Sequence, residues 1–165
     1  MRKLLLLRPE PGLSASVERA RALGLEVIGC PLFEVEPVAW KVPEPAEFDA
    51  LLLTSANAVR HGGAALARLS NLPVHAIGSA TASAAREAGF TVATVGEGDI
   101  GDLPSRVPPS LPLLHLAGED HRATDDPRIE RRIVYRSAGI TGPPLPPLNG
   151  LVVAVHSPRA ARKPG

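Results

Sequence analysis

The sequence predicts an α/β protein built on parallel sheets with helices on both faces. Short apolar runs of strand length recur along the chain, and most are followed by a turn or capping residue and a segment with helical spacing. Such alternation of strand and helix is typical of parallel sheets. The composition agrees, because 44% of the 165 residues are hydrophobic while only three Phe, one Trp and one Tyr are present. The core is therefore expected to consist of aliphatic side chains.

The N-terminal part of the chain predicts a strand–helix–strand unit. Residues 4–7 form a continuous apolar run, which is typical of a strand buried on both faces. A helix is expected next, with apolar residues at 17, 20 and 23 on one face. The predicted elements are a strand at 26–30, a half-exposed extended segment at 33–38, a helix capped by Ser14 and closed by Gly24, and a proline-containing linker or short helix start at 42–48.

The rest of the chain repeats this pattern. Ser55 is expected to cap a helix that continues to Leu69, and Ser79 or Thr81 to cap one that ends at Gly89. Ser157, followed by proline, is expected to cap a last helix. The predicted strands lie at 50–54, 74–77, 91–95, 111–117, 131–136 and 151–155.

Composition and motifs exclude several classes of function. Eighteen Lys and Arg against 17 Asp and Glu leave a net charge of +1, which excludes the basic face of a dedicated nucleic-acid binder. No window has the apolar length of a membrane span, and the run after Lys3 is too short for a signal peptide. The single cysteine, Cys30, excludes an intrachain disulfide and indicates a reducing, cytoplasmic location. Neither metal-ligand spacing nor a dinucleotide or P-loop motif is present.

Candidate site residues follow the predicted strands, because ligands of open α/β sheets bind beyond the carboxyl ends of the strands. Many are small or hydroxylated and begin a helix, where free N–H groups accept carboxylate or phosphate. Helix capping alone, without any ligand, is the commoner explanation of residues such as Ser55, Ser79, Thr81 and Ser157. His115, inside an apolar run, is typical of a hydrogen-bonded core histidine. The candidates are Arg8, Thr54, Ser55, Asn57, Gly78, Ser79, Thr81, the loop from Gly118 to Arg122, His156 and Ser157. These residues predict a protein that binds a polyanionic small molecule without a cofactor.

The order of these segments resembles the uroporphyrinogen-III synthase family. Each motif is weak alone, but their order and spacing together are fairly specific and cover nearly all of residues 4–162. The matching segments are LLLRP at 5–9, PLF at 31–33, FDALLLTSANAV at 48–59, AIGSATA at 76–82, LAGEDHR at 116–122, VYR at 134–136 and HSPRAA at 156–161.

The resemblance implies two small parallel-sheet domains of flavodoxin-like or Rossmann-like type, joined by a two-stranded linker. The first domain would be discontinuous, residues 1–35 plus 139–165, and the second would be the insertion 38–137. The family continues well past its Ser-Pro motif, whereas this sequence ends a few residues after it. The first domain is therefore expected to be incomplete, with apolar sheet faces exposed. The family is monomeric, and a dimer is expected here to cover that surface.

The resemblance also implies an activity, the cyclisation of the linear tetrapyrrole hydroxymethylbilane, with inversion of ring D, to uroporphyrinogen III. The family uses no metal or cofactor, and holding the bilane folded is the main catalytic requirement. Tyr135 matches the cleft tyrosine, a donor to the departing hydroxyl group. Motif and strand-end position together predict that the substrate is bound by Arg8, Thr54, Ser55, Ala56, Gly78, Ser79, Thr81, Gly118 and Ser157.

Two alternatives remain open. The first is a non-catalytic remnant of the family that binds a tetrapyrrole or a protein partner. It is favoured by the early end of the sequence and by the short segment 123–129, where the family has a helix and a further turn. The second is an unrelated α/β module that binds a sugar phosphate.

Overall fold

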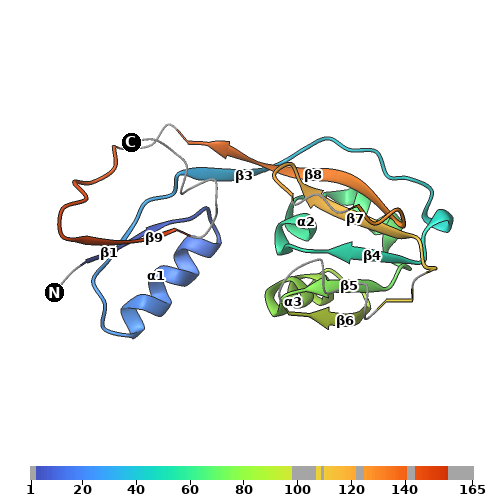
Figure 1. Ribbon diagram of the computed structural model, residues 1–165, viewed down its shortest axis with the longest axis horizontal. Helices are drawn as coiled ribbons and strands as arrows, with labels where there is room; N and C mark the ends of the chain where they lie inside the picture. The colour runs from blue at the N-terminus through green and yellow to red at the C-terminus, as the bar shows by residue number, and fades with distance from the viewer. Residues whose placement is uncertain (1–2, 98–106, 109, 122–124, 141–143, 156–165) are drawn as a thin grey trace. The chain divides into compact units, whose positions relative to one another are not determined.

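The computed structural model describes residues 3–97, 107–108, 110–121, 125–140 and 144–155 (Figure 1). The chain divides into two compact units. The first contains residues 1–35 and 137–165, and the second contains residues 36–136. That these units are two independent domains stays a prediction. None of the helices in the described part combines the length and hydrophobicity of a transmembrane helix.

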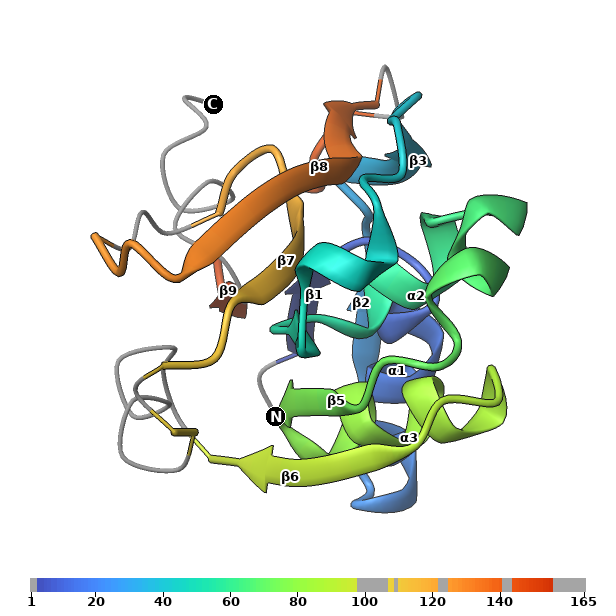
Figure 2. The same ribbon diagram turned by 90° about the vertical axis from the view of Figure 1, so that its right-hand side faces the viewer.

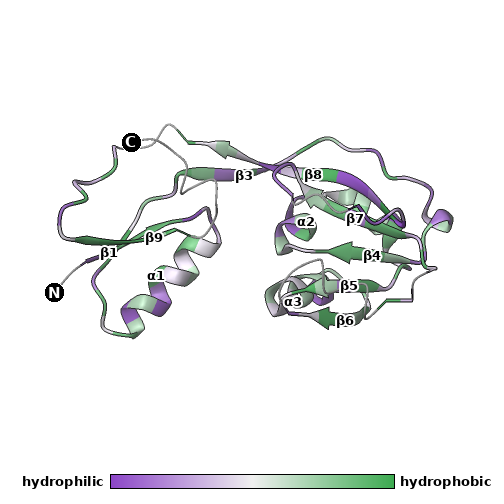
Figure 3. Ribbon diagram, in the orientation of Figure 1, coloured by the Kyte–Doolittle hydropathy of each residue, from purple (hydrophilic) through white to green (hydrophobic). Residues whose placement is uncertain are grey.

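The first unit has a small parallel sheet with the strand order β2-β1-β9. Its strands are β1 (Lys3–Leu7), β2 (Val27–Gly29) and β9 (Leu151–Val155). Leu5, Leu6 and Leu7 of the central strand are almost fully buried. The edge strand β9 is different, because Val152, Val153 and Val155 are 47%, 38% and 42% exposed. Figure 3 shows that β9 is hydrophobic along its length.

The helix of this unit, α1 (Gly12–Ala22), begins earlier than predicted. The expected capping role of Ser14 is wrong, since Ser14 lies inside the first turn of the helix. The carboxylate of Glu10 takes that role, because it accepts hydrogen bonds from the backbone N–H of Ser14 at 3.1 Å and from its hydroxyl at 2.8 Å. An acidic side chain there satisfies a free helix donor and complements the helix dipole.

The second unit is built on a six-stranded sheet with the order β3-β8-β7-β4-β5-β6 (Figures 1 and 2). The five strands from β8 to β6 are parallel to their neighbours. The strand bounds are β4 (Ala50–Leu53), β5 (Val74–Ile77), β6 (Val92–Gly96), β7 (Leu113–Gly118) and β8 (Ile129–Gly139). The α/β class with mainly parallel sheets is thus confirmed.

The remaining strand, β3 (Phe33–Pro37), pairs with β8 at the edge of this sheet. Val38 N–H donates to the carbonyl oxygen of Val134, and Ile140 N–H donates to that of Leu32. Rising numbers on one strand meet falling numbers on the other, so the pair is antiparallel. Both strands cross the boundary between the two units.

The helices of the second unit are short. They are the 3₁₀ turn η1 (Pro45–Glu47), α2 (Ala56–His61), the 3₁₀ segment η2 (Ala64–Leu69) and α3 (Ser79–Glu87). The single helix predicted from Ser55 to Leu69 is wrong. Gly62 and Gly63 interrupt it, and Gly63 has a φ of 70°, which a right-handed helix does not allow.

Of the two capping predictions that can be checked in this unit, one is confirmed and one is wrong. Ser55 caps α2, since its side chain accepts a hydrogen bond from the N–H of Asn57 at 3.2 Å. The expected capping by Ser79 or Thr81 is wrong, because Gly78 is the N-cap of α3 and neither side chain makes the bond. The helix predicted after Ser157 lies outside the described residues.

Two clusters of buried residues lie on the two faces of the second sheet. The larger cluster contains Leu51 and Leu53 of β4 together with residues of α2, η2 and α3. The smaller contains Ala50 and Leu52 of β4 with Val107. Among the described residues, helices therefore contribute to one face, whereas helices on both faces were expected.

Candidate functional site

Most of the predicted site residues lie at one edge of the second sheet. Because β4, β5 and β7 are parallel, the residues that follow them share the carboxyl edge. This edge holds the segments 54–56, 78–81 and Gly118, together with Tyr135 of β8, which pairs with Gly118. Arg8 belongs to the first unit, and Ser157 lies outside the described residues.

Tyr135 packs against Gly118 on the neighbouring strand. The register of β7 and β8 shifts between Ala117 and Gly118, and this shift brings Tyr135 beside Gly118. A Cβ atom at Gly118 would lie 2.5 Å from Cε2 of the tyrosine ring, so only glycine leaves room for it. Among the described residues the half-buried Tyr135 has no hydrogen-bond partner for its hydroxyl.

His61, at the end of α2, is the aromatic neighbour of Tyr135. The two ring centroids are 6.4 Å apart and the planes are tilted by 39°. Burial, and then the charge of Arg60, lower the pKa of His61, so its ring is neutral near pH 7. The sequence analysis missed this residue, since no motif or spacing indicates which helix end faces a distant tyrosine.

The residues that follow β4 and β5 lie at the carboxyl edge of the sheet, and several of them also stabilise the local backbone. The Ser55 hydroxyl is engaged in the helix cap, and Ala56 is 8% exposed. Gly78 has a φ of 87°, which suits a glycine and turns the chain from β5 into α3. Thr81 is only 5% exposed, whereas Ser79 is exposed. Their binding of substrate stays a prediction.

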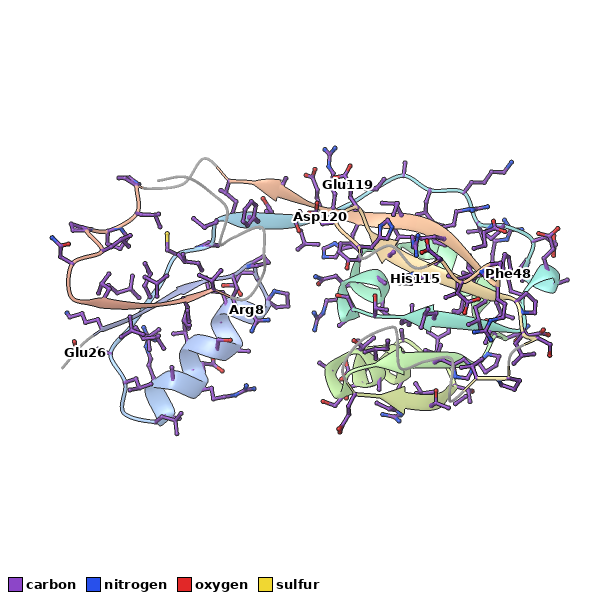
Figure 4. All side chains as sticks on the ribbon, viewed as in Figure 1. Arg8, Glu26, Phe48, His115, Glu119 and Asp120 are labelled. Atoms are coloured by element: carbon purple, nitrogen blue, oxygen red, sulfur yellow. The ribbon has the colours of Figure 1, made fainter. Side chains whose placement is uncertain are left out.

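A chain of hydrogen bonds links Thr54 to the interior of the sheet. Oγ1 of Thr54 is 3.1 Å from Nε2 of His115, and Nε of Arg131 donates to Nδ1 of His115 at 3.3 Å. His115 lies on β7 (Figure 4) and is 1% exposed, which confirms the predicted hydrogen-bonded core histidine. Burial, followed by the nearby charges of Arg131 and His121, lowers the pKa of His115 to about 4.

In the first unit, Arg8 is held by α1. Figure 4 labels Arg8 beside α1. Nη1 of Arg8 donates to Oγ of Ser16 at 2.9 Å, and a Cβ atom at Gly12 would lie 2.4 Å from its Nη2. A fixed guanidinium is a suitable partner for a carboxylate. In the described part of the chain, no three His, Cys, Asp or Glu side chains are grouped to hold a metal ion.

Comparison with known proteins identifies a family. The model of the family described as uroporphyrinogen-III synthase HemD matches residues 14–127, which is more than half of the chain. A search of curated proteins found no match.

Two solved structures of uroporphyrinogen III synthase from the extremely thermophilic bacterium Thermus thermophilus are similar in fold. A selenomethionine-labelled mutant superposes with a TM-score of 0.52 at 22% identity, over 84% of this chain and 64% of that chain. The wild-type protein gives a TM-score of 0.47 at 22% identity, over 84% and 63% of the two chains. The chain thus spans less than two thirds of the length of these proteins. The match over residues 14–127 shows that the chain belongs to the uroporphyrinogen-III synthase family.

Proposed function

We propose that this protein closes hydroxymethylbilane to uroporphyrinogen III with inversion of ring D, as an enzyme of tetrapyrrole biosynthesis. Family membership supports the reaction class. The observation that supports catalysis by this chain is the position of Tyr135, which lies against Gly118 at the carboxyl edge with a hydroxyl that no described residue engages. The single, buried and reduced cysteine suits the cytoplasm, where we propose that the protein acts.

The proposed role of Tyr135 follows from the bond that breaks. The hydroxyl group of the bilane leaves as water, so its oxygen needs a hydrogen-bond or proton donor as the C–O bond lengthens. A phenol O–H supplies that donor. The residues proposed to bind carboxylates of the bilane are Arg8, Thr54, Ser55, Ala56, Gly78, Ser79, Thr81, Gly118 and Ser157. Bound in this way, the bilane is held folded, which favours ring closure through proximity.

A coupled assay tests the proposal. Hydroxymethylbilane is generated in situ, and the oxidised uroporphyrin isomers are separated by chromatography. The bilane closes unaided to the type I isomer, so each sample contains its own control. Formation of more type III isomer than in a blank without protein supports the proposed enzymatic activity. Type I isomer alone, from a sample shown to be folded, contradicts it and favours the non-catalytic protein that binds a tetrapyrrole.

A further inference from the structure

His115, Arg131 and Thr54 form a directed chain of hydrogen bonds. Arg131 and His115 are paired in register on the neighbouring strands β8 and β7, so both side chains lie on the same face of the sheet. Thr54 follows β4 at the carboxyl edge. The chain of bonds therefore runs from the interior of the sheet to the edge where substrate is proposed to bind.

The direction of each bond follows from the chemistry of the groups. An arginine N–H can only donate, so Nδ1 of His115 has to be the unprotonated acceptor in the 3.3 Å contact. A neutral histidine with a bare Nδ1 has its proton on Nε2. Nε2–H then donates to Oγ1 of Thr54 over 3.1 Å. The hydroxyl hydrogen of Thr54 is left free, and no other partner for it exists among the described residues.

We infer that His115 is a positioning residue, which fixes the Thr54 hydroxyl as a hydrogen-bond donor to a carboxylate of the substrate. The inference rests on the proposed function, since it concerns how the same edge recognises a polycarboxylate. His115 does not touch the substrate, and it acts through Thr54. A hydroxyl without a fixed partner can turn its hydrogen in any direction, whereas one that accepts from Nε2–H has its hydrogen directed away from His115.

Two features of the surroundings support this role. Burial of His115, and after it the charges of Arg131 and His121, oppose a second proton on the ring, so the pKa of His115 is about 4 and the ring stays neutral at physiological pH. The arrangement also has a counterpart on the same face. His75 of β5 is 7% exposed, and its Nδ1 lies 2.7 Å from Oγ1 of Thr94. Thr94 lies in the middle of the edge strand β6, so that pair does not reach the carboxyl edge of the sheet.

The first test is the tautomer of His115. Correlation spectra of ¹⁵N-labelled protein distinguish a proton on Nε2 from one on Nδ1, and His115→Gln identifies the signal. We expect the neutral Nε2–H form at about pH 7. A neutral Nδ1–H form or a doubly protonated ring overturns the inference.

The second test is a double-mutant cycle in the coupled assay. Thr54→Val removes the donor and is expected to raise KM about tenfold, as the loss of a hydrogen bond to a carboxylate does. His115→Leu is expected to raise KM in the wild-type background but to have little further effect beside Thr54→Val. His115→Gln, whose amide N–H can still donate to Thr54, should restore most of the affinity. His75→Leu is the matched control, expected to lower stability without raising KM.

Additive effects of His115→Leu and Thr54→Val, or an equal rise in KM for His75→Leu, overturn the inference. Failure of the proposed function has a separate signature, which is the absence of type III isomer with the wild-type protein. In that case the four single variants and the double variant of His115→Leu with Thr54→Val are compared by their binding of uroporphyrin III, measured by fluorescence. Coupled losses of affinity there support the positioning role, and additive or absent losses overturn it.

Discussion

The phenol of Tyr135 owes its position to a glycine on the next strand. The ring occupies the space that a Cβ atom at Gly118 would fill, while the hydroxyl has no partner among the described residues. Because no described residue contacts that hydroxyl through a hydrogen bond, we expect its removal to affect the reaction without a comparable loss of stability.

Tyr135→Phe is expected to lower the rate of type III isomer formation on the order of a hundredfold, the lower range for loss of a proton donor. Stability should change by less than about 0.5 kcal/mol, because the ring and its packing are kept. The coupled assay and urea unfolding measure the two effects. An unchanged rate would remove Tyr135 from the mechanism.

Gly118→Ala is the complementary change. The new methyl group would overlap the ring and displace Tyr135, so we expect both activity and stability to fall, the latter by about 1–3 kcal/mol. A fully active Gly118→Ala variant would show that the ring position is irrelevant to the reaction.

His115 makes stability depend on pH. Its pKa is about 4 in the folded chain against an ordinary value of 6.5, so between these values the unfolded chain binds a proton that the folded chain does not. Stability therefore falls as the pH falls through this window. From about pH 7.5 to about pH 5, His115 is expected to lower the free energy of unfolding by about 2 kcal/mol.

Urea unfolding of the wild-type protein and of His115→Gln at the two pH values isolates this effect, since the other titrating groups are common to both. The variant should lose less stability on acidification. Equal losses in the two proteins would contradict the low pKa.

Among the elements, the two predicted caps Ser14 and Ser55 turn out to have different roles. Ser55 accepts the N–H of Asn57, whereas Ser14 lies inside α1 and is bound to Glu10. Ser55→Ala is expected to cost about 1 kcal/mol of stability, and the matched Ser14→Ala less than about 0.5 kcal/mol. Urea unfolding measures both, and equal losses would contradict the assignment of the cap.

Most strands were predictable because they are short apolar runs that end in turn residues. The strands at 74–77 and 151–155 lie where the sequence analysis placed them. The break between α2 and η2 was predictable in principle from Gly62 and Gly63, but their effect depends on the positive φ of Gly63, which local spacing does not show. The length of β8 also escaped prediction, since the residues that it adds to the predicted strand, Ile129, Glu130 and 137–139, form no apolar run.

The candidate site was accessible to sequence reasoning only in part. The residues after β4, β5 and β7 could be placed at one edge from topology alone. The contacts of Tyr135 with Gly118 and His61 required the register of β7 and β8, including its shift. The pairing of His115 with Arg131 required the same register, and no local pattern encodes it.

For the whole molecule, the edge strand β9 predicts self-association. It has no charged residue, and Val152, Val153 and Val155 are all substantially exposed. Among the described residues, β9 pairs with β1 on one side only, and an apolar edge without a partner strand is a template for another strand. We therefore expect a dimer through β9, in which backbone groups of the two edges pair.

Sedimentation velocity over a range of concentrations tests this expectation. Val153→Lys should shift the protein to monomer, because a lysine at the edge opposes strand pairing. Leu25→Lys is the matched control, since Leu25 is 41% exposed in the same unit but lies outside β9. A wild-type monomer at every concentration would contradict the predicted dimer.

The antiparallel pair of β3 and β8 also bears on how such a chain could arise. The chain enters the second unit along β3 and leaves it along β8, and Glu36 and Arg136 form an ion pair across the two strands. Entry and exit are therefore neighbours. A gene segment encoding residues 36–136 could have been spliced into a smaller ancestral protein as one cassette, without separating β1 from β9, which pair in the first sheet although nearly the whole sequence lies between them.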